Sequence, residues 1–258
     1  MKKPKLLIVI PARSGSTRIK NKNIRKIGSK SLLELKIKTC LKVKNARIIV
    51  STNSKSIAKI ATSFGAEVPY LRPNKYSTPT SSTLACVLDL LRFLKKNNNE
   101  IPEFVGIFPP TNPFLRSNTI DQGFKQLTKN KKKFNSIVGY TQATDHPYLY
   151  ISNLKSKIKF NLLRYMNTKY SDFERTQDWP KAFIASASLK IVKTSFLMKY
   201  INNFSSKINK KTFDINNSAG IKISKFENFD INDELDLKIA NSINEILGKK
   251  YFNHSKKI

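Results

Sequence analysis

One segment near the start of the chain combines small residues with basic ones. Residues 10–24 read Ile-Pro-Ala-Arg-Ser-Gly-Ser-Thr-Arg-Ile-Lys-Asn-Lys-Asn-Ile and directly follow an apolar run. Small residues let a ligand approach the backbone, and successive backbone N–H groups in such a loop bind anions. Four cations lie in the segment: Arg13, Arg18, Lys20 and Lys22. The segment matches neither a Walker A loop nor Gly-x-Gly-x-x-Gly, so we predict an anion-binding loop of another kind, with a basic surface loop as the alternative.

Short β-rich runs alternate with helical patterns over the first 140 residues. The strand-like runs are rich in Val and Ile, as expected for strands buried on both faces: Lys5–Ile10, Ala46–Ser51, Glu67–Leu71, Glu103–Phe108 and Ser136–Tyr140. Helical spacing predicts helices between them: Ser31–Val43, Ser54–Phe64, Thr80–Lys96 and Ser117–Lys129. Ser54 is expected to cap the second helix and Gly65 to end it. This order predicts an α/β fold with a mostly parallel central sheet, helices on both faces and ligand-binding loops along one edge.

The alternation stops near Thr141. We expect residues 142–191, which include the apolar run Ala182–Ile191, to form an inserted β-rich arm. Such an arm has too little core of its own, so it is expected to pack on a second subunit of a homodimer. Residues 1–258 otherwise form one domain, whose last part contains a helix, a strand and an amphipathic helix: Ser195–Tyr200, Ile221–Ile223 and Asp233–Leu247.

The composition is strongly basic. The 258 residues include 48 Lys and Arg against 17 Asp and Glu, a formal charge of +31. Because the lysines are spread along the chain without a nucleic-acid-binding motif, we expect no specific nucleic acid partner; an anionic ligand such as a nucleotide also suits this charge. Two cysteines, Cys40 and Cys86, are too few for a disulfide-stabilised fold or a cysteine-ligated zinc site. This cysteine usage favours a reducing compartment, the cytoplasm. We expect no membrane partner, since no apolar run approaches ~20 residues.

Further motifs follow in order along the chain: Val50–Ser54, Gly65–Pro69, Arg72-Pro73, Pro110–Phe114, His146-Pro147 and Asp230–Leu237. Together with the loop of residues 10–24, they resemble the acylneuraminate cytidylyltransferase family, the CMP-sialic acid synthetases and their relatives. The resemblance implies a Rossmann-like nucleotidyltransferase that converts CTP and a 2-keto-3-deoxy sugar acid to the CMP-sugar and pyrophosphate. It also implies Mg²⁺ or Mn²⁺ as the metal.

The resemblance assigns residues to the nucleotide, the metal and the sugar. Those implied at CTP are Ala12, Arg13, Ser14, Gly15, Ser16, Arg18, Lys22, Asn23, Arg72, Ser82 and Thr83. Arg13 and Lys22 would hold phosphates and act in catalysis with Asp230. The implied metal ligands are Asp230, Asn232 and Asp233, although Asn232 or Asp233 could instead cap the following helix. The implied sugar-site residues are Thr111, His146, Arg175 and Gln177, and Arg175 lies in a segment that would reach the sugar site of the neighbouring subunit.

The chain departs from the family pattern at several positions. Asn232 stands where the family usually has a second Asp, and Ile184 where it usually has an Arg that could bind the sugar carboxylate. Thr17 replaces a usual Lys of the phosphate loop. The nucleotide half therefore follows the family more closely than the sugar half. Alternatives are a Kdo cytidylyltransferase, a sugar-1-phosphate nucleotidyltransferase, and a noncatalytic relative that binds nucleotide or RNA.

Overall fold

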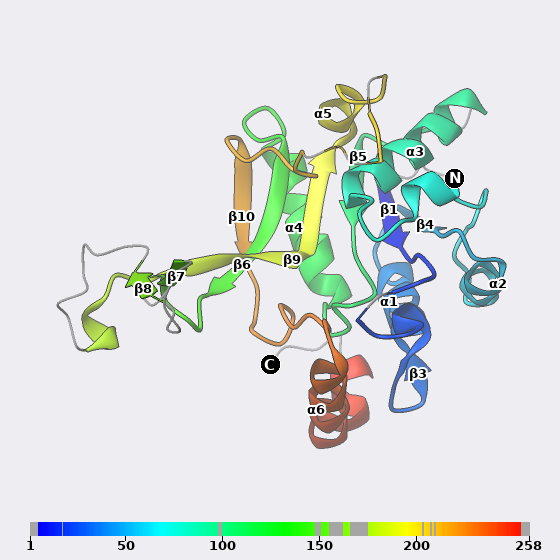
Figure 1. Ribbon diagram of the computed structural model, residues 1–258. Helices are drawn as coiled ribbons and strands as arrows, with labels where there is room; N and C mark the ends of the chain where they lie inside the picture. The colour runs from blue at the N-terminus through cyan, green and yellow to red at the C-terminus, as the bar shows by residue number, and fades with distance from the viewer. Residues whose placement is uncertain are drawn as a thin grey trace.

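The structure is a computed structural model that describes residues 5–16, 18–97, 100–147, 151–154, 162–165, 175–202, 204–206, 208 and 210–253. A six-stranded sheet in the order β10-β6-β9-β5-β1-β4 forms its centre (Figure 1). These strands are β1 Leu6–Pro11, β4 Ala46–Ser51, β5 Phe104–Ile107, β6 Ser136–Gln142, β9 Phe183–Lys193 and β10 Ser218–Lys222. Within this sheet β9 runs antiparallel to both neighbours, whereas the β1–β4, β1–β5 and β10–β6 pairs are parallel. The predicted mostly parallel α/β sheet is confirmed.

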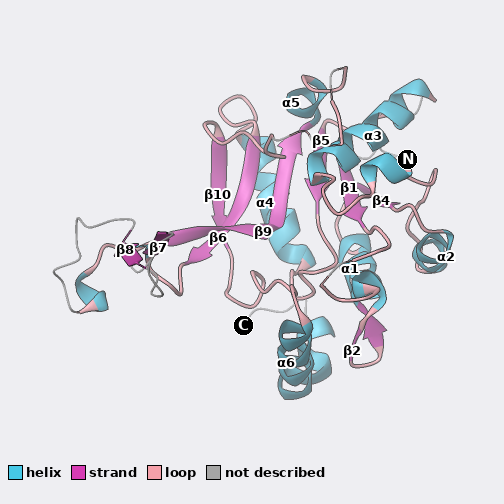
Figure 2. Cartoon of the chain, in the orientation of Figure 1, coloured by secondary structure: helices cyan, strands magenta, loops and turns pink. Residues whose placement is uncertain are grey.

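Helices cover both faces of the sheet, as predicted (Figure 2). They are α1 Leu32–Leu41, α2 Lys55–Ser63, α3 Thr83–Lys96, α4 Ser117–Lys129, α5 Thr194–Met198 and α6 Glu234–Asn253, with the 3-10 helices η1 Lys22–Ile24, η2 Asn74–Tyr76 and η4 Thr176–Asp178. Apolar residues of α1, α2 and α4 pack with Leu6 and Ile8, and those of α3 and α5 pack with Leu7 and Val9. Successive residues of β1 are buried on opposite faces, which explains its uninterrupted apolar sequence.

The predicted boundaries of α2 are confirmed, but the strand predicted after it is wrong. Ser54 Oγ accepts a hydrogen bond from the backbone N–H of Ile57 at 3.4 Å, and Gly65 follows the helix with a φ of +88°. Of the predicted strand Glu67–Leu71, only Glu67 forms a bridge, at the edge of β4. Pro69 has no N–H to extend a ladder, so the chain leaves the sheet there.

The last residues of the predicted arm, 189–191, belong to the central sheet, which corrects the predicted end of the arm at residue 191, whereas residues 183–185 pair with the extending end of β6. Both stretches lie within β9, where Ile191 pairs with Gly106 of β5 and Ile137 of β6 in the middle of the sheet. Leu189 and Ile191 are completely buried. β6 and β9 extend away from the sheet toward a separate antiparallel hairpin, β7 Ile151–Leu154 and β8 Leu162–Tyr165 (Figure 1).

The last helix runs past its predicted end at Leu247 to Asn253. It packs against the hairpin of β2 (Lys26–Ile27) and β3 (Lys30–Ser31), where Asn241 Oδ1 accepts from the backbone N–H of Gly28 at 3.0 Å. α6 is thereby attached to the short hairpin that follows the basic loop. No helix in the described part of the chain is long and apolar enough to cross a membrane.

Candidate active site

A cavity of about 240 Å³ lies at the carboxyl-terminal edge of the parallel strands. Pro11 at the end of β1 and Pro109 and Thr111 after β5 contribute to its walls. The structure brings many of the implied nucleotide-binding residues to this cavity: Arg13, Ser16, Arg18, Lys22, Asn23, Arg72, Ser82 and Thr83. This is the edge at which open α/β sheets bind ligands.

The cavity is electropositive. Its described lining includes four cations, Arg13, Arg18, Lys22 and Arg72, and no acid. Burial lowers the pKa of Arg13, and the neighbouring charge of Arg72 lowers it further. Burial also lowers the pKa of Lys22, although the charge of Asp230 opposes this. Partly desolvated cations that repel one another are stabilised by an anion, so the cavity suits a polyphosphate.

Lys22 and its neighbours join the basic loop to the segment before α6. Lys22 Nζ donates to the backbone oxygen of Ile231 at 2.9 Å, and Arg18 Nη1 donates to Asn232 Oδ1 at 3.2 Å. Asn23 Nδ2 donates to a backbone oxygen of the basic loop at 2.9 Å. Two segments at opposite ends of the chain therefore meet at one cavity.

The backbone of the basic loop serves the fold more than was expected. The N–H of Ala12 donates to the backbone oxygen of Ser51 at 2.9 Å, and that of Ser14 donates to Asn53 Oδ1 at 2.9 Å. Gly15 adopts a left-handed φ of +73°. Two amides of the loop are therefore committed to protein acceptors, so the predicted backbone cradle has fewer donors for an anion than expected. Thr17 lies outside the described residues.

Arg72 also lines the cavity and is only 4% exposed. Its guanidinium donates to Ser77 Oγ at 2.9 Å and to Cys86 Sγ at 2.5 Å. Ser82 Oγ caps α3 by accepting from the backbone N–H of Ala85 at 3.1 Å. Among the described residues Arg72 forms no ion pair with a carboxylate. The charges of Arg72 and Asp89 attract each other without a direct ion pair, and an anion bound in the cavity would further offset the cost of burying this cation.

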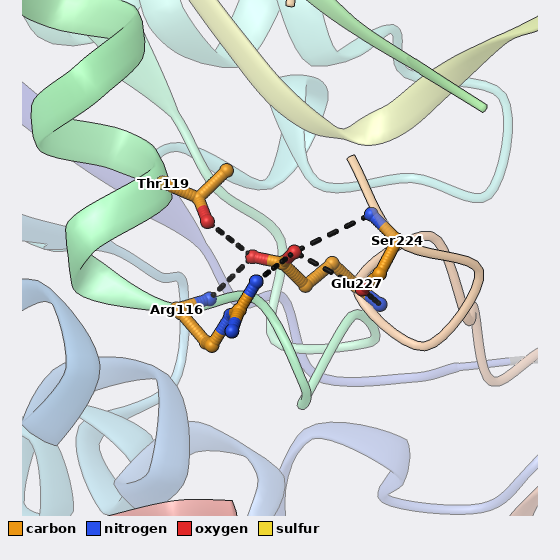
Figure 3. A network of polar contacts seen from close by, with 4 residues as sticks. All are labelled: Arg116, Thr119, Ser224 and Glu227. Atoms are coloured by element: carbon orange, nitrogen blue, oxygen red, sulfur yellow. Dashed lines mark hydrogen bonds and ion pairs between the residues drawn. The ribbon is translucent and has the colours of Figure 1, made fainter. Parts of the chain in front are cut away.

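The segment that carries Asp230 is anchored by a buried carboxylate. Glu227, 1% exposed, accepts from Arg116 Nη2 at 3.0 Å, from Thr119 Oγ1 at 2.5 Å and from Ser224 Oγ at 3.0 Å (Figure 3). Burial alone would raise the pKa of Glu227, but the hydrogen bonds from Arg116 and Thr119 outweigh it and hold this pKa below its usual value. The carboxylate therefore stays ionised and ties the segment to the start of α4.

The three implied metal ligands have different environments. Asp230 Oδ1 is buried and has no hydrogen-bond partner among the described residues. Asn232 Oδ1 instead accepts from Arg18. Asp233 is exposed and caps α6, since its Oδ1 accepts from the backbone N–H of Asp236 at 3.0 Å. The helix-capping alternative therefore describes Asp233, and Asp230 is the carboxylate that can take a cation.

A second cavity of about 360 Å³ lies at the end of β6. Its lining is mostly polar and comprises Thr141, Gln142, Ala143, Thr144, Asp145, Ile184, Lys225, Asn228 and Phe229. β6 runs in the same direction as β1 and β5, because both β6 and β5 pair antiparallel with β9. The two cavities thus share one edge of the sheet, with Asp230 directly after Phe229 on the segment that passes both.

Most of the implied sugar-site residues lie away from both cavities. Thr111 lines the basic cavity. His146 Nε2 lies 2.8 Å from the backbone oxygen of Pro180, and its ring lies 4.9 Å from that of Trp179. Arg175 and Gln177 are exposed in the η4 region. Within the described chain the structure therefore does not bring His146, Arg175 or Gln177 to Thr111.

A buried lysine lies behind the basic cavity. Lys36 of α1 is 0% exposed, and its Nζ donates to the backbone oxygen of Asn112 at 2.7 Å. Burial lowers the pKa of Lys36 to about 8, although the charges of Asp230 and Glu227 act in the opposite direction. Burial raises the pKa of the Cys40 thiol to about 12, so this group is uncharged while Lys36 titrates.

The pH dependence of the free energy of unfolding should reveal the lowered pKa of Lys36. Because the pKa of Lys36 falls from 10.5 to about 8 on folding, the cost of burying its charge is complete below pH 8 and disappears toward pH 10.5. Between these values the wild type should gain roughly 3 kcal/mol relative to Lys36→Met. Urea unfolding across this range measures the difference, with exposed Lys38→Met as control; parallel pH curves for wild type and Lys36→Met would refute it.

The family model for cytidylyltransferases matches residues 7–219. The chain belongs to the cytidylyltransferase family. This cytidylyltransferase is 39% identical over 117 residues to CMP-N,N'-diacetyllegionaminic acid synthase of Legionella pneumophila, and the match spans 45% of the chain and only half (50%) of that relative. It is 26% identical to the Campylobacter jejuni protein of the same name, over 91% of the chain and 93% of that relative.

A solved structure has the same fold as this cytidylyltransferase. It is a CMP:2-keto-3-deoxy-manno-octonic acid synthetase complexed with CTP, with a TM-score of 0.65 at 13% identity, and the match covers 94% of this chain and 99% of that one. The family membership and these matches confirm the resemblance that the motifs indicated.

Several residues that line the two cavities of the cytidylyltransferase were not predicted from the sequence. Tyr76 and Cys86 line the basic cavity, and Lys225 lines the second one. They lie outside the motifs, and the packing of η2, of α3 and of the segment before Asp230 brings them to the cavities. The burial of Lys36 could have been predicted from the sequence. Lys36 lies four residues after Leu32 and four residues before Cys40, so it shares the buried side of α1 with them.

Proposed function

We propose that this cytidylyltransferase joins CTP to a nonulosonic acid, a sialic-acid-like 2-keto-3-deoxy sugar acid, with release of pyrophosphate. The observation that carries the proposal is the basic cavity, in which four cations and no acid line the described walls next to the segment of Asp230. The names of the Legionella and Campylobacter relatives, both CMP-N,N'-diacetyllegionaminic acid synthases, support a legionaminic-acid-like acceptor.

The proposed reaction is an in-line attack of the sugar's anomeric hydroxyl on the α-phosphate. The hydroxyl loses its proton as the new P–O bond forms, and pyrophosphate leaves. Arg13, Arg18 and Lys22 hold the triphosphate by charge-assisted hydrogen bonds and stabilise the charge that develops on the leaving group. Arg72 adds positive charge to the cavity, and the hydroxyls of Ser82 and Thr83 in its lining can contact the nucleotide.

The residues around Asp230 fit Mg²⁺ or Mn²⁺ bound together with the triphosphate. The buried Asp230 Oδ1 without a hydrogen-bond partner is the hard oxygen ligand that such ions prefer. Mg²⁺ is commonly held by one or two carboxylates plus substrate phosphates, so the single carboxylate of Asp230 is sufficient. When bound, the ion neutralises phosphate charge.

The test of this function is pyrophosphate release from CTP and Mg²⁺ with a panel of acceptors. Legionaminic, pseudaminic and N-acetylneuraminic acids represent the proposed class, and Kdo and a sugar 1-phosphate represent the alternatives. Turnover with at least one nonulosonic acid and CTP, but not ATP, is expected. Turnover with Kdo or the sugar 1-phosphate alone, or with no acceptor, would refute the proposed substrate class.

The second cavity is the proposed acceptor site. Hydroxyl, amide and aromatic side chains at Thr141, Gln142, Asn228 and Phe229 suit a polyhydroxylated sugar. Lys225 is the cation of the described lining, and it can bind the sugar carboxylate that the Arg replaced by Ile184 would have held.

Lys225→Met is expected to raise the KM for the sugar acid about five- to tenfold and to leave the KM for CTP unchanged, because one charge-assisted hydrogen bond is lost. Steady-state kinetics with each substrate varied in turn measure both constants. Lys222→Met removes an exposed charge outside the cavity and serves as control. Equal effects of the two substitutions would mean that Lys225 does not bind the acceptor.

We further propose a cytoplasmic homodimer. Phe183 and Ile184, at the end of β9 that extends from the sheet, are 52% and 47% exposed, and exposed apolar groups of this kind favour a subunit contact. Light scattering should give about twice the mass of 29.5 kDa, and Phe183→Asp with Ile184→Asp should shift it toward the monomer. A monomeric wild type would contradict the proposal.

A further inference from the structure

Lys36 is a cation in the interior with few partners. Its side chain is 0% exposed, and its described interactions include one hydrogen bond, to the backbone oxygen of Asn112 at 2.7 Å. An ammonium has three donors, so two of them lack a protein acceptor within the described chain. Burying a charge with so little compensation is costly. A lysine at this position therefore points to a role other than stabilising the fold.

The residue that Lys36 holds lies at the junction of the two active-site segments. Asn112 belongs to the loop after β5, and its Nδ2 donates to the backbone oxygen of Phe229 at 3.0 Å. The preceding residue, Thr111, lines the basic cavity, and its backbone oxygen accepts from Ile231 N–H at 2.9 Å. The loop therefore holds the backbone on both sides of Asp230.

Two buried acceptors near this junction also lack partners. Asn112 Oδ1 and Asp230 Oδ1 are both buried without a hydrogen bond in the described chain. The acids whose charges act on Lys36 are Asp230 and Glu227, and Glu227 is already occupied by Arg116 and Thr119. Asp230 is therefore the acidic neighbour of Lys36 with a buried oxygen that lacks a hydrogen bond, and its charge also acts on Lys22 and Lys190.

We propose that Lys36 is a positioning residue for Asp230: its buried ammonium fixes the loop at Asn112 and so sets the place and charge environment of the metal-binding carboxylate. The inference rests on the proposed function, because it gives Asp230 its role there. Lys36 itself does not line the basic cavity, so it acts through the loop and not on the substrate.

A purely structural role predicts a different result. Replacing a buried, poorly compensated charge with an apolar side chain of similar size is often neutral or stabilising. Lys36→Met should therefore keep or raise the melting temperature while function falls. If Lys36 only supported the fold, stability and activity would fall together. Lys36→Gln, which can still donate a hydrogen bond but has no charge, separates the two contributions and provides a second variant.

The experiment compares wild type, Lys36→Met, Lys36→Gln and the control Lys38→Met, which removes an exposed charge from the same helix. We expect Lys36→Met to lower kcat at least tenfold, to weaken Mn²⁺ binding to the protein–CTP complex severalfold by electron paramagnetic resonance, and to change the KM for CTP less than threefold. Lys36→Gln should fall between it and the wild type. Lys38→Met should match the wild type.

The outcomes separate this inference from the proposed function. Wild-type kcat and Mn²⁺ affinity in Lys36→Met, or equal losses of stability and kcat in both Lys36 variants, would overturn the positioning role and leave the cytidylyltransferase reaction standing. A wild type that turns over no acceptor but binds Mn²⁺ with CTP would refute the proposed acceptors while the Mn²⁺ measurement still decides on Lys36. A wild type that does neither would overturn both.

Discussion

Asp230→Ala is expected to lower kcat about a thousandfold with little change in the melting temperature. The carboxylate is the one implied metal ligand whose buried oxygen lacks a partner in the described chain, so its removal costs transition-state charge stabilisation and not hydrogen bonds of the fold. Loss of a single preorganised electrostatic group typically costs a factor of about 10²–10³, and loss of the metal adds to this. Pyrophosphate release and thermal unfolding measure the two effects.

Asp233→Ala is the matched control for this substitution. It removes an aspartate three residues away that caps α6, so it should cost about 1 kcal/mol of stability and less than about threefold in kcat. If Asp230→Ala kept more than about a tenth of the wild-type rate at limiting Mg²⁺, or if Asp233→Ala were the more damaging change, Asp230 would not be the metal ligand.

Lys22→Met should lower kcat/KM for CTP about a hundredfold. Lys22 lines the basic cavity, and its Nζ also donates to the backbone oxygen of Ile231 at 2.9 Å, so the substitution removes a phosphate contact and loosens the segment that carries Asp230. Charge-assisted hydrogen bonds to phosphate are the stronger class, and together the two losses correspond to about 2.7 kcal/mol. Initial rates at varied CTP measure the effect.

Lys20→Met tests whether the loss of any positive charge from this loop would lower kcat/KM for CTP. Lys20 lies two residues away in the same loop, is exposed and does not line the cavity. It should change kcat/KM less than threefold at 0.15 M salt, where exposed charges are screened. Similar losses in both variants would mean that CTP responds to the charge of the whole surface and not to the cavity.

The sequence was sufficient for the parts of the fold that local chemistry determines. The uninterrupted apolar run of β1 specifies a strand buried on both faces, and Ser54 and Gly65 mark the ends of α2 by capping chemistry. The strand predicted at Glu67–Leu71 was wrong because residue composition alone does not make a strand. A β-ladder also needs backbone N–H donors, and Pro69 has none. The end of the arm within β9 was misplaced because pairing between residues far apart in sequence decides where an arm ends and a central strand begins.

The candidate site also has parts that the sequence predicts and parts that depend on tertiary contacts. The basic loop and Asp230 are visible as motifs, and the structure brings them together through Lys22 and Ile231. The second cavity could not be predicted, because it forms between the end of β6 and residues 225–229, which no local pattern joins. The use of Ser14 N–H by Asn53 is likewise a tertiary contact that no loop motif reveals.

A crystal structure with CTP and Mn²⁺ tests the central claim most directly. We expect the triphosphate between Arg13, Lys22 and Arg72, and an anomalous Mn²⁺ peak within about 2.5 Å of an Asp230 carboxylate oxygen and of the phosphates. A triphosphate bound outside the basic cavity, or a Mn²⁺ ion held without Asp230, would contradict the account.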